Sequence, residues 1–221
     1  VAAGTGAWLD GQLLAPLLAP SPDGELVVAG TMSDNGSINV FTPPLARGKR
    51  WSRGVVVPGH AGVGDTYLAR FDAAGARLVT GGLGTAATVW RVRGGVVDEP
   101  RALPLGAAIR DAIFMPADTL VALTDAQVAS FRGDDLAPWG TPVTTPTPGM
   151  NSLALVGSDA SLLAVGFAAD AQVHVFDPGR LAPWSPRPLE RADPEEKLPH
   201  AFIGAAPGIA VDAAGTRVAI A

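Results

Sequence analysis

Residues 67–90 read Tyr67-Leu-Ala-Arg-Phe71, Asp72-Ala-Ala-Gly75, Arg77-Leu-Val-Thr-Gly81 and, after a short gap, Ala86-Ala-Thr-Val-Trp90. Three short apolar runs alternate with small and polar turn residues, which is typical of antiparallel strands. Gly75 ends the first turn and tolerates the positive φ that a tight hairpin requires. We therefore expect three consecutive strands, the last of which ends at an aromatic residue.

The same unit recurs along the whole chain. The aromatics that close its third strand are Phe41, Trp90, Phe131 and Phe176, separated by 49, 41 and 45 positions. A period of about 40 to 45 residues is typical of a four-stranded propeller blade. The sequence therefore predicts an all-β fold, a β-propeller of four-stranded antiparallel blades.

The residues within each unit fit this interpretation. The second strands are nearly continuous runs of small apolar residues, as expected when both faces are buried between neighbouring blades. They end in Gly30, Gly81 or Gly166, which would let adjacent sheets approach closely. Leu-Ala-Pro-Trp occurs twice at the same offset, ending at Trp139 and Trp184, as expected from duplication of a blade.

Composition limits the classes of function. The chain has 221 residues, a net charge of −5 and no cysteine. The negative charge argues against broad nucleic-acid binding, and the lack of cysteine excludes disulfides and thiolate zinc sites. No apolar run approaches the length of a membrane span, so we expect a soluble protein. We expect it inside the cell, although the absence of cysteine fits either redox compartment.

These units resemble the WD40 repeat family over nearly the whole chain. The best match comprises Gly59-His60, Phe71 to Gly75, Leu78 to Gly81 and Thr88-Val-Trp90. The resemblance implies a network in which a His, a hairpin Asp, a Ser or Thr and the Trp are joined. The residues at such positions are His60, Thr80, Trp90, Asn35, Asp125, Asp170, Phe176 and Asp177. The copies are divergent, because Gly84 replaces the Asp and Arg91 follows Trp90, and the remaining Asp residues are also ordinary turn formers.

The resemblance also sets the expected domain organisation. We expect one WD40-like domain over residues 1–221, with a proline-rich inserted loop over 177–200. The blade-like units span about 13–58, 66–105, 108–145, 150–203, and 207–221 together with 1–12 as an incomplete blade. About five blades are thus present. They form either a five-bladed ring or, as the family resemblance favours, part of a seven-bladed propeller completed by further blades or another chain.

Candidate chemistry is sparse. His60, His174 and His200 are the only histidines, and no local spacing indicates a metal site, a serine nucleophile or a phosphate loop. We expect no catalytic, cofactor-binding or metal-binding residues. Pro207 to Gly215 also resembles repeats of lactonase-type propellers, which keeps a sugar-acid hydrolase as the alternative.

We expect the chain to bind other proteins. It would act as a non-catalytic scaffold and as a subunit of a larger assembly. Arg50, Trp51 and Arg53 form a basic, aromatic loop that is either solvated or a contact with an acidic partner or RNA. Trp139 and Trp184 are further candidates, and Trp184 either anchors a docking strap within 177–200 or packs on its own blade. The sequence does not identify these protein partners.

Overall fold

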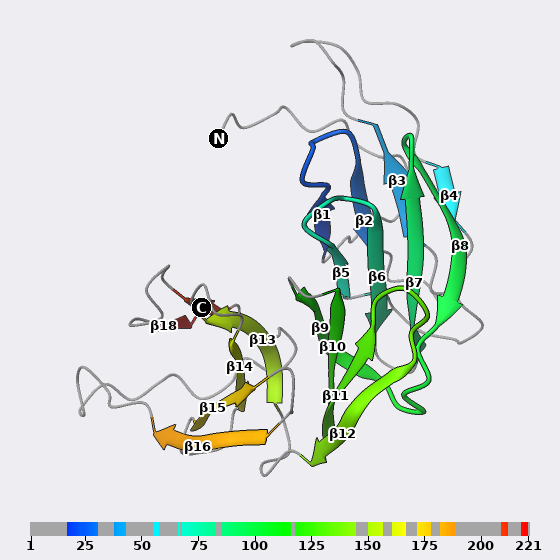
Figure 1. Cartoon of the computed structure of the whole chain (residues 1–221). Helices are drawn as coiled ribbons and strands as arrows, with labels where there is room; N and C mark the ends of the chain where they lie inside the picture. Colours follow the sequence, from blue (N-terminus) through cyan, green and yellow to red (C-terminus); the bar gives the residue numbers. More distant parts are fainter. Residues whose placement is uncertain are drawn as a thin grey trace. The chain divides into compact units, whose positions relative to one another are not determined.

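The computed structural model describes residues 17–30, 38–42, 55–57, 66, 68–82, 85–115, 118–144, 150–156, 161–166, 172–177, 182–188, 209–211 and 218–220. Within these ranges the regular structure consists of strands (Figure 1). The chain divides into two compact units, Val1–Ala108 and Ile109–Ala221. The predicted all-β fold is confirmed.

The first unit contains two four-stranded antiparallel sheets. Each is a meander in which strands that follow one another in sequence are paired side by side. The first sheet consists of β1 (Leu18–Pro20), β2 (Val27–Gly30), β3 (Ile38–Phe41) and β4 (Val55–Val57). The second consists of β5 (Leu68–Phe71), β6 (Arg77–Gly82), β7 (Thr85–Arg93) and β8 (Val96–Ala102).

The second unit contains two sheets of the same order and a two-stranded sheet. The third sheet consists of β9 (Ile109–Met115), β10 (Thr119–Thr124), β11 (Gln127–Arg132) and β12 (Pro138–Thr144). The fourth consists of β13 (Met150–Val156), β14 (Ser161–Gly166), β15 (Gln172–Asp177) and β16 (Ala182–Pro188). The last two strands are β17 (Ile209–Val211) and β18 (Val218–Ile220).

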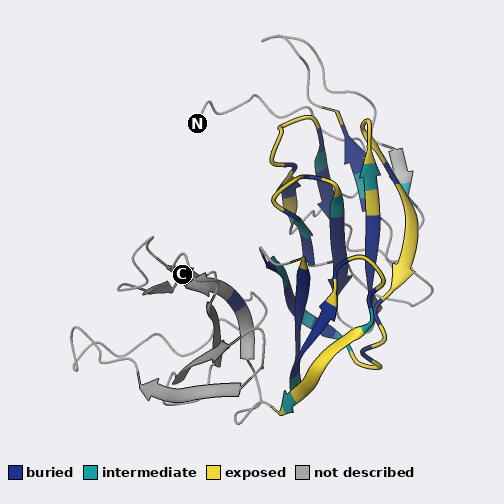
Figure 2. Ribbon diagram, viewed as in Figure 1, coloured by how far each residue is buried: buried dark blue, intermediate teal, exposed yellow. Residues whose placement is uncertain are grey.

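Burial falls from the inner strands to the outer strand of a sheet. Every residue of β10 is buried, whereas β8 and β12 are exposed along almost their whole length (Figure 2). Both faces of a second strand are therefore covered, as its continuous apolar sequence predicts. The outer strands present the side chains that are available to solvent.

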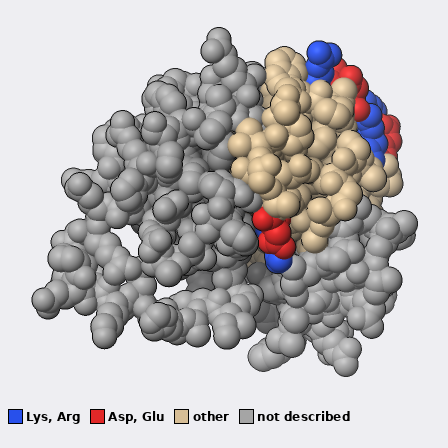
Figure 3. All heavy atoms as spheres, turned by 90° about the horizontal axis from the view of Figure 1, so that it is seen from below, with Lys and Arg blue, Asp and Glu red and all other residues tan. Residues whose placement is uncertain are grey.

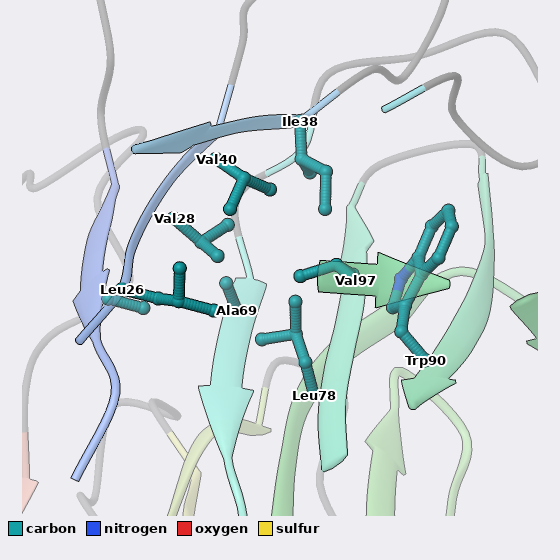
Figure 4. Packing of buried hydrophobic residues seen from close by; sticks show 9 residues of the cluster. Leu26, Val28, Ile38, Val40, Ala69, Leu78, Trp90 and Val97 are labelled. Atoms are coloured by element: carbon teal, nitrogen blue, oxygen red, sulfur yellow. The ribbon is translucent and has the colours of Figure 1, made fainter. Parts of the chain in front are cut away.

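The core of the first unit lies between its two sheets (Figure 4). The first sheet contributes Ala19, Leu26, Val28, Ile38 and Val40, and the second contributes Ala69, Leu78, Trp90 and Val97. The two sheets of the first unit thus bury their apolar faces against one another, which is how repeated units that cannot fold alone stabilise one another.

Gly30, the last residue of β2, lies against the segment of chain that precedes β5. A Cβ atom at Gly30 would lie 2.3 Å from the backbone oxygen of Thr66. No side chain fits at that distance, so the expectation that a glycine ending the second strand permits close approach is confirmed at this position.

Part of the predicted inserted loop over 177–200 is a strand. β16 occupies Ala182–Pro188 and pairs with β15 as the outer strand of the fourth sheet. Three prolines made this segment read as a loop. Prolines are nevertheless tolerated in an edge strand, because one side of that strand needs no backbone donors. The remaining expectation of an insertion, over residues 189–200, falls outside the described residues.

Candidate functional site

Thr80 and Trp90, two of the predicted network residues, are joined inside the second sheet. Trp90 on β7 is 2% exposed, and its indole Nε1 donates a hydrogen bond of 2.8 Å to Oγ1 of Thr80, which is fully buried on β6. A buried indole N–H needs an acceptor, and the threonine hydroxyl supplies it.

The register of the sheets explains why this pair occurs in the second sheet. Thr80 lies two residues beyond Leu78, the cross-strand partner of Trp90. The matching positions in the three other four-stranded sheets are all alanine, and there the closing aromatic is phenylalanine, which has no N–H to satisfy. These pairs are Ala29 with Phe41, Ala122 with Phe131, and Ala164 with Phe176.

Thr88 is a polar residue that the sequence reasoning missed. It lies opposite Thr80 across the β6–β7 ladder and is 1% exposed. Its hydroxyl oxygen has no hydrogen-bond partner among the residues that the structure describes. A threonine two positions before the closing Trp was the available signal.

Asp125, in the turn between β10 and β11, forms an exposed ion pair. Both of its carboxylate oxygens accept hydrogen bonds of 2.7 Å from Nε and Nη2 of Arg110 on β9. These hydrogen bonds lower the pKa of Asp125 and raise the pKa of Arg110. Sequence reasoning placed Asp125 in the turn but did not identify Arg110, which lies 15 positions earlier.

Asp111 is a buried carboxylate that links two sheets of the second unit. It is 3% exposed on β9, and its Oδ2 accepts a hydrogen bond of 2.7 Å from the backbone N–H of Leu153 on β13. Its Oδ1 accepts a second bond of 2.8 Å from the backbone N–H of Ala112. An acidic residue within a mostly apolar strand was the signal for this connection.

Trp139 lies on the outer strand of the third sheet, in a surface that we call the rim patch. The rim patch consists of Arg132, Pro138, Trp139 and Pro142. Trp139 is 41% exposed, and the guanidinium carbon of Arg132 lies 5.2 Å from the centre of its ring. The hydroxyl of Ser130 donates a hydrogen bond to the carbonyl oxygen of Trp139, so the backbone of the tryptophan is held while its ring contacts Arg132.

The structure does not bring all predicted residues together. Phe176 and Asp177 lie in β15, and Trp184 lies in β16 opposite Val175. The other predicted residues fall outside the described part of the chain. They are His60, Asn35, Asp170, Trp51, Arg50 and Arg53.

Charge on the described surface is mixed in sign. Arg91 and Arg93 lie 3.2 and 3.9 Å from the carboxylate oxygens of Glu99 across the β7–β8 hairpin. On the face shown in Figure 3, basic and acidic side chains likewise adjoin one another at the margins. Among the described residues there is no group of three or more His, Asp or Glu that could hold a metal ion. The described residues include no helix long and apolar enough to cross a membrane.

The meandering four-stranded sheets, each packed on the next within its unit, define the fold as a β-propeller. No protein-family model matches the chain, and no curated protein matches its sequence. The chain is, however, similar to solved β-propeller structures.

One similar structure is a chain of the crystal structure of a mitotic checkpoint complex. The TM-score is 0.67 at 13% sequence identity, over 93% of this chain and 57% of that chain. A chain of hydrazine synthase from Kuenenia stuttgartiensis gives a TM-score of 0.57 at 14% identity, over 80% of this chain and 51% of that chain. This chain therefore spans just over half the length of each.

Proposed function

We propose that this chain is a non-catalytic scaffold that binds other proteins as a subunit of a larger assembly. The observation that carries the proposal is the contrast between the buried strand β10 and the outer strands β8 and β12, whose side chains are exposed. Interfaces use aromatic and arginine anchors held on a rigid support, and Trp139 beside Arg132 has that form. The similar chain from a mitotic checkpoint complex is also part of a protein complex.

We propose further that the propeller is a divergent member of the WD40 type. The Thr80–Trp90 hydrogen bond supports this, because the resemblance implies contact between those two positions. The roles proposed for His60, Asn35 and Asp170 rest on the sequence pattern. A His60→Ala variant that melts at the same temperature as the unmodified chain would count against a structural role for this histidine.

Completion of the ring by additional blades or by another chain is part of the proposal. The chain spans only 57% and 51% of the two similar chains, which supports a propeller larger than the blades present here. Light scattering coupled to gel filtration distinguishes the arrangements. Association of the chain into larger species supports missing blades, whereas a stable 22.4 kDa monomer supports a self-closed ring.

A propeller enzyme of the lactonase type is the second candidate. It is favoured by the sequence over Pro207 to Gly215, which resembles repeats of such propellers. The similar chain of hydrazine synthase comes from an enzyme, but it shares only the fold with this chain. Such an enzyme needs carboxylates and a histidine converging on a central channel, typically around Ca²⁺. A melting temperature that Ca²⁺ leaves unchanged would count against this candidate, and a rise by several degrees would favour it.

The test of the scaffold proposal is affinity purification of the tagged chain from its source cells, followed by mass spectrometry and gel filtration. We expect a reproducible set of proteins that co-elute with the chain well above 22.4 kDa. The tagged chain denatured by heat before incubation serves as the control for capture by unfolded protein, and proteins common to both baits are discounted. Elution of the unmodified chain by itself would contradict the proposal.

A further inference from the structure

Two side chains of the rim patch carry hydrogen-bond donors that have no acceptor among the described residues. Within the described part of the chain, neither the guanidinium of Arg132 nor the indole N–H of Trp139 takes part in a hydrogen bond or ion pair. Both groups can only donate, because a guanidinium and an indole have no acceptor lone pair available. A ligand of this patch therefore gains hydrogen bonds by supplying acceptors to these two side chains.

The backbone beside these side chains is unsuited to pairing with another strand. Pro138 and Pro142 on β12 have no N–H to donate, and Gly140 between them has a φ of +75°. The ladder between β11 and β12 also shifts register between Val128 and Ser130. Prolines and bulges of this kind blunt an edge strand against strand addition. An extended partner in β-conformation is thereby disfavoured.

We propose that the rim patch binds a proline-rich segment of a partner protein in the polyproline II conformation. Such a segment presents backbone carbonyls and flat pyrrolidine rings, and it lacks most N–H groups. Its carbonyls match the free donors of Arg132 and Trp139, and its rings match the exposed indole face. This inference deepens the proposed scaffold function and rests on it, because it names the kind of partner segment that one blade recognises.

The contacts that position Trp139 are present before any ligand binds, which favours a role of this residue in binding. The Trp139 ring is covered on one side by Arg132, and its backbone carbonyl is held by Ser130. The polyproline II helix is likewise formed before binding, so neither side loses much conformational freedom on association.

The fourth sheet repeats the backbone arrangement of the rim patch. Trp184 lies opposite Val175 in the same register in which Trp139 lies opposite Ser130, and both ladders shift register just before that pair. The third and fourth sheets thus share both the Leu-Ala-Pro-Trp sequence and the register shift of the outer strand. The same outer-strand backbone is therefore built in both sheets.

Fluorescence anisotropy tests the proposal with a labelled peptide of eight prolines, titrated with the intact chain. A peptide of the same length that alternates Thr and Val is the comparator for strand addition. We expect the polyproline peptide to bind with a Kd below about 1 mM and the comparator not to bind. Truncation of a central aromatic anchor is the largest expected loss, so Trp139→Ala should weaken binding at least about tenfold.

Three further variants separate the contributions of Arg132 and Trp139 to the affinity for the polyproline peptide. Arg132→Ala should weaken binding by a smaller factor, and Trp139→Tyr, which keeps a ring and a donor, should restore most of the affinity. Leu18→Ala removes another exposed apolar side chain, on β1, and should leave the Kd unchanged. Melting temperatures equal to that of the unmodified chain show that the exposed substitutions leave the fold intact.

Several outcomes would overturn the proposal. They are absence of polyproline binding at millimolar chain, equal binding by Trp139→Ala, and binding of the Thr-Val peptide alone. The affinity purification described above keeps this failure distinct from failure of the scaffold function. If Trp139→Ala retains every co-purifying protein, the rim patch is not the docking surface while the scaffold proposal stands.

Discussion

Replacement of Thr80 by Val is expected to destabilise the second sheet by about 1–3 kcal/mol. Valine has nearly the shape of threonine, so the packing around position 80 is retained, but the indole N–H of Trp90 loses its acceptor. Trp90 is 2% exposed, so water does not replace the lost bond. The expected magnitude is the cost of leaving one buried donor unsatisfied.

Thr80→Val should leave the free energy of unfolding almost unchanged when residue 90 is phenylalanine. Trp90→Phe removes the donor, and Thr80→Val then exchanges an unused buried hydroxyl for a methyl group. The coupling free energy between the two positions should therefore be about 1–3 kcal/mol. Thr80→Ser, which keeps the acceptor, is the matched control and should cost less than Thr80→Val.

Urea unfolding followed by far-ultraviolet circular dichroism measures the four free energies, because this signal does not depend on the tryptophan being replaced. The comparison is valid where the variants share one denaturant slope. If Thr80→Val is equally costly with Trp and with Phe at position 90, the two side chains are uncoupled. The account of why alanine accompanies phenylalanine in the other sheets would then be wrong.

Three further predictions concern the sheet contacts. Gly30→Ala should lower the free energy of unfolding by at least about 2 kcal/mol in the same urea assay, because the added Cβ overlaps the backbone oxygen of Thr66. Asp125→Asn should cost only about 0.2–1 kcal/mol near pH 7, since its ion pair with Arg110 is exposed. Because this pair lowers the folded-state pKa of Asp125, the difference should be full above its unfolded pKa of about 3.9 and vanish as pH falls through the folded value; a difference unchanged at pH 2 would refute it. Asp111→Asn should accelerate hydrogen exchange of the Leu153 amide by about 10- to 100-fold, measured by NMR, and an unchanged rate would show that Oδ2 does not protect it.

The strand pattern was predictable because it is local and repeated. The run Arg77 to Gly81 is mostly apolar after its first residue, which predicts a buried strand. The turn before it ends at Gly75, which adopts a φ of +68° that glycine tolerates. The spacing of the closing aromatics then identified the four-stranded unit. At Gly30, the small residue at the strand end correctly indicated the close approach of a neighbouring segment of chain.

The charged contacts were not predictable from the sequence, since they depend on register between distant segments. Arg110 and Asp125 meet because β9 and β10 are paired, and Asp111 reaches Leu153 across 42 positions of chain. The strand at Ala182–Pro188 was missed for a different reason. Its prolines argue against a strand in general, and only its place at a sheet edge makes them acceptable.

The bond from Asp111 to the Leu153 amide means that the third and fourth sheets are not interchangeable cassettes. A chain cut, permuted or recombined between β12 and β13 would separate a main-chain donor from the carboxylate that serves it, and would leave an acidic group facing an apolar seam. Junctions for recombining this part of the chain therefore belong elsewhere, and a transplanted copy of the fourth sheet needs a preceding sheet that supplies an acceptor at the position of Asp111.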